Sequence, residues 1–129
     1  DLFIQSVPYN PVFDRGADTV YGLQLRDMNQ KPIDLRGYSA KLTIYPYQRA
    51  AAKENPTIYD TLSTDDGRIY GKDEDGEKTS LNESGVIWVE FPKDVTKGYK
   101  WNRGWYKLEI TSVGGYVYRV ADGDIAVRD

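Results

Sequence analysis

Short stretches in which apolar and polar residues alternate are the feature that most limits how this chain can fold. In the segment 20–26, Tyr21, Leu23 and Leu25 fall on one side. The same period of two recurs in 38–47, 86–91 and 105–111. Successive side chains of a β-strand point to opposite faces, so this period predicts strands with one buried face. The predicted core residues are Leu42, Ile87, Val89, Tyr106, Leu108 and Ile110.

Turn-forming residues separate these segments and delimit further short strands. The additional predicted strands are 57–62, 68–71, 116–121 and 125–128. The Asp66-Gly67 step between the first two suits a hairpin turn with positive φ. The segment 122–124 is predicted to be a bulge within one long hairpin arm. Only residues 48–54 have good helix propensity, and so short a segment forms a turn or two of helix at most.

The number and spacing of these strands predict the fold class. About seven or eight strands, without an amphipathic helix long enough for a crossover between parallel strands, favour an all-β, antiparallel immunoglobulin-like β-sandwich. The length of 129 residues suits a single domain over 1–129. Tyr106 stands two residues before the inward position of Leu108, which is the spacing of a tyrosine corner. The alternative is that Tyr106 is simply a core aromatic residue.

The composition excludes several classes of function. The chain has no cysteine and no histidine, which removes thiolate nucleophiles, disulfides, imidazole bases and the usual zinc and haem ligands. Its net charge is −3, so no general attraction draws it to nucleic acid. No apolar run approaches the roughly 18 residues of a membrane span. We therefore predict a chain without cofactor, nucleic-acid partner or membrane partner.

Carboxylates are concentrated in one part of the chain. Eight of the 20 acidic residues lie within 60–83. The segment 72–77 lacks the ligand spacing of a calcium loop, so we predict solvated turn tips and no metal site. Glu90 and Glu109 stand in strands among aromatic residues, where a glycosidase would need two carboxylates facing each other. Alternation turns both outward, so we predict no catalytic residues and a non-enzymatic chain.

Aromatic and basic residues gather in another part of the chain. The candidate interface consists of Trp88, Tyr99, Lys100, Trp101, Arg103, Trp105 and Lys107. Amphipathic rings stack on sugars or anchor protein partners. The cations in 95–121 also oppose the acidic segment 60–83, and such opposed patches suit head-to-tail docking between copies. Two hypotheses stay open: a protein–protein interface, and a carbohydrate-binding module that uses Trp88, Trp101 and Trp105 on a glycan.

Three turn segments occur in a familiar order. They are Phe13-Asp14-Arg15-Gly16-Ala17-Asp18-Thr19, then 27–40 with Ile33-Asp34-Leu35-Arg36-Gly37, and finally 115–120 with Gly123. This order resembles small structural domains of tailed bacteriophages, including the N-terminal domain of baseplate upper proteins. Their pattern contains Arg-Gly-Asp-Thr, Asp-x-x-Gly-x-Pro-Ile-Asp-Leu-x-Gly and Gly-x-Val-x-Arg. The likeness covers nearly the whole chain, which differs by inserting Ala17 and by having Gln30-Lys31 where a glycine is usual.

The resemblance implies a structural role. Such domains carry no catalytic residues and serve as tail, baseplate or connector components of the virion, which is assembled in the host cytoplasm. The implied partners are other virion proteins and copies of the chain itself. The turn Asp34 to Gly37 needs no ligand to explain it, because a tight turn there would place Leu35 in the core.

Overall fold

The computed structural model describes residues 7–8, 10–46 and 58–129, and strands joined by turns make up most of them. Within these ranges the helix is α2 (Lys93–Thr96). The predicted helical turn at 48–54 and the start of the predicted strand 57–62 lie outside the described residues. No helix in the described ranges combines the length and apolar character required to cross a bilayer. The prediction of an all-β chain is confirmed.

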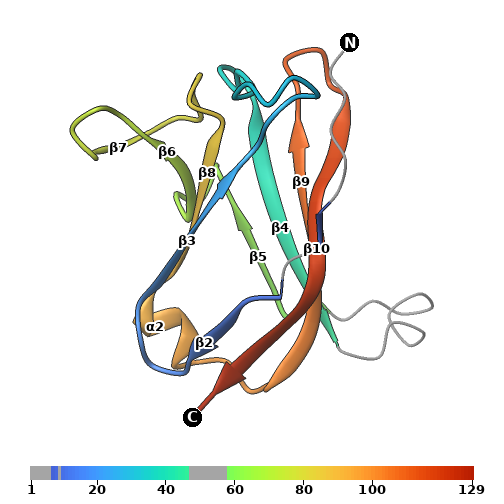
Figure 1. Cartoon of the computed structure of the whole chain (residues 1–129). Coiled ribbons are helices and arrows are strands. Elements are labelled where there is room, and N and C mark those ends of the chain that lie inside the picture. The colour runs from blue at the N-terminus through green and yellow to red at the C-terminus, as the bar shows by residue number, and fades with distance from the viewer. Residues whose placement is uncertain (1–6, 9, 47–57) are drawn as a thin grey trace.

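The described strands form two sheets, which stand side by side in Figure 1. The first sheet has the order β1 (Val7–Pro8), β10 (Val117–Arg128), β9 (Arg103–Thr111), β4 (Ser39–Pro46) and β5 (Asp60–Ser63), with β2 (Val12–Asp14) also paired to β10. The second has the order β3 (Thr19–Gln24), β8 (Val86–Phe91), β6 (Ile69–Lys72) and β7 (Lys78–Thr79).

The first sheet is mixed. β1 and β2 run parallel to β10, whereas β9, β4 and β5 pair antiparallel to their neighbours. The prediction of a wholly antiparallel structure is therefore wrong for the two N-terminal strands. No strand is predicted from the sequence at 7–8 or 12–14, because segments of two or three residues are too short to show a period of two.

The core lies between the two sheets. All six predicted core residues are buried, and Leu108 on β9 is the register partner of Leu42 on β4. Alternation in 38–47 places Thr43 with Lys41 and Tyr45 on the face opposite Leu42 and Ile44, yet Thr43 is only 4% exposed. Thr43 lies on β4, which has neighbours on both sides, and its register partners are Lys107 on β9 and Thr61 on β5.

Two predicted connections differ in the structure. Gly67 has the expected positive φ of 81°, but β5 pairs with β4 while β6 pairs with β8. The turn at 64–67 therefore carries the chain between sheets and closes no hairpin. β10 is continuous through 122–124, and its irregularity lies at Val120, where the step from Arg119 to Ala121 on β10 matches one step on β9. Val120 and Ala121 are consequently both buried.

Candidate interaction surfaces

Two of the predicted interface residues belong to the core. Tyr99 and Trp101 follow α2, and each is only 8% exposed. The Trp101 ring stacks on Tyr59 with centroids 4.9 Å apart and planes 6° apart, and Phe13 meets its edge. These rings therefore pack the end of the molecule near α2 and offer no exposed face to a ligand.

A polar network anchors Tyr99. Its hydroxyl donates to Asp60 Oδ2 at 2.6 Å, and Arg68 Nη1 lies 2.9 Å from the same oxygen. Burial and then the hydrogen bond to Asp60 raise the pKa of Tyr99. Burial acts to lower the pKa of Arg68, but its bonds to Asp60 and Asp66 outweigh this and raise it. Two of the eight carboxylates in 60–83 thus hold Arg68 in place, and Asp60 also accepts from the buried Tyr99.

Arg15 fixes the loop that precedes β9. Its guanidinium donates to the carbonyl oxygens of Tyr99 and Trp101 and to the side chain of Asn102. The same group forms an ion pair with Asp129 at 2.7 Å. Donation from a cation to main-chain carbonyls positions a loop that has no regular hydrogen bonding of its own.

The residues after Arg15 hold α2 in place. The Gly16 amide donates to Thr96 Oγ1 at 3.0 Å, and that hydroxyl donates to the Ala17 carbonyl at 3.1 Å. Asp18 Oδ1 accepts a hydrogen bond of 2.7 Å from the Lys93 amide, the first amide of the helix. The motif at 13–19 therefore has a structural explanation in this chain.

The remaining aromatic residues of the prediction lie apart from one another. Trp105 faces outward from β9 and stacks on Tyr45 of β4, with centroids 4.6 Å apart. Trp88 faces outward from β8 in the other sheet and lies against Gly22, which has no side chain to block it. Lys72 Nζ stands 4.0 Å above the Trp88 ring. With Trp101 buried, the three tryptophans do not form one platform.

The two carboxylates considered for glycoside hydrolysis are also separated. Glu90 lies on the outer face of the second sheet, where it accepts a 2.9 Å hydrogen bond from Tyr70 and pairs with Lys78 at 3.3 Å. Burial and this hydrogen bond raise the pKa of Tyr70 to about 12. Glu109 lies on the outer face of the first sheet. A pair facing across a substrate does not form, and no group of three metal-ligating side chains occurs in the described ranges.

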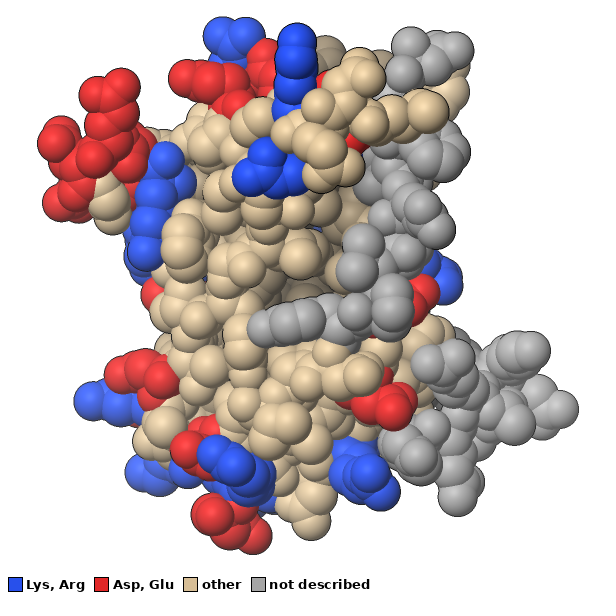
Figure 2. Space-filling view, in the orientation of Figure 1, with Lys and Arg blue, Asp and Glu red and all other residues tan. Residues whose placement is uncertain are grey.

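Opposite charges gather at opposite ends of the molecule. We call Asp73, Glu74, Asp75 and Glu77, at the tip between β6 and β7, the acidic pole. We call Lys93, Lys97, Lys100 and Arg103, on α2 and the chain leading into β9, the basic pole. All eight residues are exposed. In Figure 1 the β6–β7 tip and α2 lie at opposite ends of the second sheet, and Figure 2 shows the acidic pole as a projecting red cluster. Lys107 lies apart, half-buried on β9 and 3.7 Å from Glu109.

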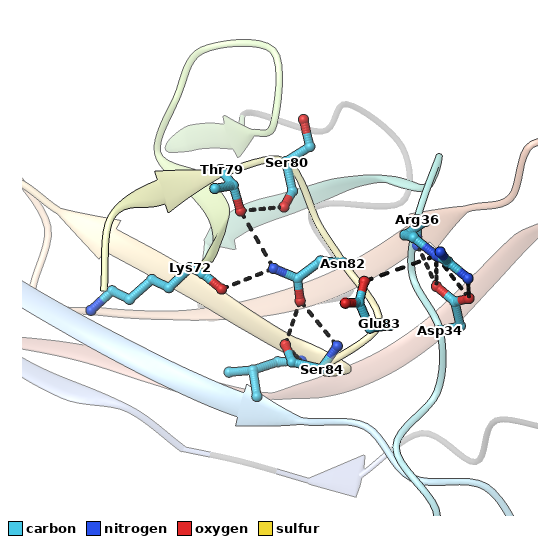
Figure 3. A network of polar contacts seen from close by, with 9 residues as sticks. Asp34, Arg36, Lys72, Thr79, Ser80, Asn82, Glu83 and Ser84 are labelled. Atoms are coloured by element: carbon cyan, nitrogen blue, oxygen red, sulfur yellow. Dashed lines mark hydrogen bonds and ion pairs between the residues drawn. The ribbon is translucent and has the colours of Figure 1, made fainter. Parts of the chain in front are cut away.

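The loop end is a third surface, which we define as the connections 25–38, 80–85 and 112–116. Asn82 organises its centre, as Figure 3 shows. Its amide nitrogen donates to the Lys72 carbonyl at 2.9 Å and to Thr79 Oγ1, and its amide oxygen accepts from the amide and hydroxyl of Ser84. Every hydrogen-bonding position of this amide is used, so Asn82 is a structural staple and leaves no group for a ligand.

Beside this staple, the 34–37 turn is fixed by a local ion pair. Asp34 accepts hydrogen bonds from the amide and guanidinium of Arg36, which also lies 3.9 Å from Glu83. Leu35 between them is fully buried, as the sequence predicts. The side-chain and then the backbone hydrogen bonds from Arg36 lower the pKa of Asp34.

Exposed apolar side chains also gather at the loop end. Val113 and Tyr116, in the turn between β9 and β10, are 78% and 70% exposed, and the adjacent Val117 and the loop residue Met28 are exposed as well. The alternation pattern does not single them out, because 112–115 lies between the predicted strands 105–111 and 116–121 and is typical of a turn. An apolar residue beside two glycines in a polar turn was the available signal.

Comparison with known proteins assigns neither a family nor an activity. No protein-family model matches the chain, and no curated protein matches it. Among solved structures, the chain is similar to extracellular domains 3–5 of Drosophila OTK, with 12% sequence identity and a TM-score of 0.39. The match covers 100% of this chain and 36% of that chain, so this chain spans about a third of its length.

Proposed function

We propose that this chain is a non-enzymatic structural or assembly module of a tailed-phage virion, in the tail, the baseplate or a connector. It works through contacts with other virion proteins and with copies of itself. The motifs that carry the resemblance have structural roles that support this proposal. Arg15 holds the loop before β9, and Leu35 enters the core. Gln30 occupies the place of the motif's glycine, and its φ of 64° is one that glycine adopts without strain.

We further propose that the fold is of the immunoglobulin-like kind. The order β5-β4-β9-β10 in one sheet follows the C′-C-F-G order of a variable-type domain. The order β3-β8-β6 in the other follows B-E-D. In this arrangement the loop end corresponds to one of the two ends where connections cluster and where such domains bind partners.

One observation carries the functional proposal: the loop end combines exposed apolar side chains with a rigid polar support. Val113 and Tyr116 offer apolar area that protein partners bury, and Asn82 and Arg36 hold the loops beside them. A surface that is already ordered loses less conformational entropy when a partner binds. This favours protein docking over chemistry on a small substrate.

The experiment is recovery of the chain from purified virions of the phage that encodes it. Mass spectrometry should find the wild-type chain in the particles, and the double variant Val113→Ser/Tyr116→Ser should be incorporated less. Val20→Ser is the matched control, because Val20 is exposed on β3 away from the loop end. Absence of the wild-type chain from the virions would refute the proposal.

A second candidate function is glycan binding at Trp88, favoured by the position of its ring on a sheet face against Gly22. Lys72 stands over the same ring and would have to move for a sugar to stack there. A glycan array with the wild-type chain and with Trp88→Ala tests this candidate. Binding that is specific, insensitive to salt and absent in the variant would favour it over the assembly role.

A further inference from the structure

We propose that copies of this chain associate head to tail, with the acidic pole of one copy docked against the basic pole of the next. The inference rests on the proposed function, in which the chain assembles with itself, and it names the two surfaces that meet. The contact joins different surfaces, so it repeats along an open row or closes into a ring.

The first support for head-to-tail association is that most charged side chains of the two poles form no ion pair within the described part of the chain. Asp73, Glu74, Asp75 and Glu77 form no ion pair with any described residue, and neither do Lys93, Lys97 and Lys100. By contrast, Arg15, Arg68, Lys107, Arg119 and Arg128 each pair with a carboxylate of the chain. These seven charges can therefore interact with opposite charges on another molecule.

The charges around each pole reinforce its sign. The lysines that flank the acidic pole turn toward the sheet, since Lys72 lies over Trp88 and Lys78 pairs with Glu90. At the other end Asp94 is the acidic residue of 93–103, against the four cations of the basic pole. Asp18 also faces α2, where its carboxylate accepts from the Lys93 amide. Each pole therefore keeps a net charge of one sign.

Both poles are held in shape before any partner arrives. Asp73 Oδ1 accepts hydrogen bonds of 2.9 Å from the amides of Asp75 and Glu77, which closes the turn at the acidic pole. The basic pole is held through α2 by Asp18 and through the following loop by Arg15. Their separation along the molecule in Figure 1 prevents one copy from joining its own poles and directs each pole to another copy.

The test is sedimentation of three proteins at low salt. The wild type should associate increasingly with concentration, whereas Lys97→Glu/Lys100→Glu and Glu74→Lys/Asp75→Lys should each weaken self-association at least about tenfold. A mixture of the two variants should associate again, because each supplies the pole that the other has reversed. Raising NaCl from about 20 mM to about 500 mM should dissociate the wild type, since it shortens the Debye length from about 20 Å to about 4 Å.

The control Lys31→Glu/Lys41→Glu changes the net charge as much as Lys97→Glu/Lys100→Glu does, but at two exposed lysines outside both poles. This control should associate as the wild type does. Circular dichroism checks that every variant is folded. A wild type that stays monomeric at low salt, reversed variants that still associate, or a mixture that stays monomeric would each overturn the inference. A chain found in virions yet monomeric refutes only this inference, whereas one that associates but is absent from virions refutes only the proposed function.

Discussion

The two ends of the molecule are both built from loops, but arginine plays different parts in them. At the end with the basic pole, the Arg15 side chain is 21% exposed and fixes the main chain of the loop before β9. At the loop end, the Arg36 side chain is 70% exposed and pairs with Asp34 in its own turn. There the neutral amide of Asn82 connects the segments. The comparison teaches that burial and choice of acceptor, rather than charge, decide whether an arginine stabilises the fold.

The largest expected effect concerns a backbone position at the loop end. Gly85 has a φ of 72°, and a Cβ atom there would lie 2.8 Å from the Leu25 carbonyl oxygen and 2.9 Å from that of Ile33. Gly85→Ala should lower the free energy of unfolding by about 3–4 kcal/mol, because strained backbone and overpacking add. Gly76→Ala, with φ of 80° and open space around it, should cost only about 1 kcal/mol. Urea denaturation measures both, and equal losses would contradict the steric explanation.

The next prediction tests the two arginines directly. Arg15→Ala should lower the free energy of unfolding by about 2–3 kcal/mol, because carbonyl groups of the loop lose a charged donor. Arg36→Ala should cost about 0.5 kcal/mol or less, as expected for an exposed ion pair. Thermal unfolding of the wild type and of the two variants measures these losses of stability. If Arg36→Ala proved the more damaging, burial would not be the deciding factor.

A smaller effect should appear at high pH. Tyr99→Phe should cost about 1 kcal/mol near neutral pH through the lost hydrogen bond to Asp60. Because the pKa of Tyr99 is raised in the folded state, the unfolded chain loses its proton first as pH rises above the ordinary value of 10.0. Stability therefore falls with pH above that value, and Tyr99→Phe should reduce this fall. Tyr70→Phe should change the pH dependence of stability only between pH 10 and about 12, because the pKa of Tyr70 is raised to about 12. Unchanged profiles of stability against pH in both variants would refute this assignment.

The smallest effect is a gain in stability. Gln30 has a positive φ that glycine adopts freely, so Gln30→Gly should raise the free energy of unfolding by about 0.5–1 kcal/mol. Asn29→Gly is the control, because the neighbouring residue does not have a positive φ and should be destabilised by the added freedom. A loss of stability in Gln30→Gly would show that the side chain contributes more than the backbone strain costs.

Alternation was sufficient to predict β3, β4, β8 and β9, because a strand with one buried face leaves that pattern in its own residues. It did not predict that Tyr99 and Trp101 are buried. The carbonyl oxygens of both residues accept hydrogen bonds from Arg15, which lies more than 80 residues away in sequence and leaves no local pattern around them. The crossing between sheets after β5 was missed for a related reason, since Gly67 is required by a tight turn whichever strand follows.

The candidate surfaces were predicted in part. Acidic and basic residues that cluster along the sequence also cluster in space as the two poles, because each pole comes from one contiguous segment. Trp88, Trp101 and Trp105 were grouped by chemistry alone, and the fold places them on one sheet face, in the core and on the other sheet face. Residues that are distant in sequence can share a surface only if the topology brings their strands together, and a single sequence does not contain that information.

The parallel pairing of β2 with β10 has a mechanical consequence. Val12 to Asp14 lie beside Ala126 to Arg128, and the amide of Arg15 donates to the Arg128 carbonyl at 2.8 Å. A force that pulls the start of β2 away from the end of β10 makes two parallel strands slide past each other. All the hydrogen bonds between them then bear the load together, whereas in a pulled hairpin they would open one at a time. The β2–β10 pairing is therefore expected to resist such a force better than a hairpin with the same number of hydrogen bonds.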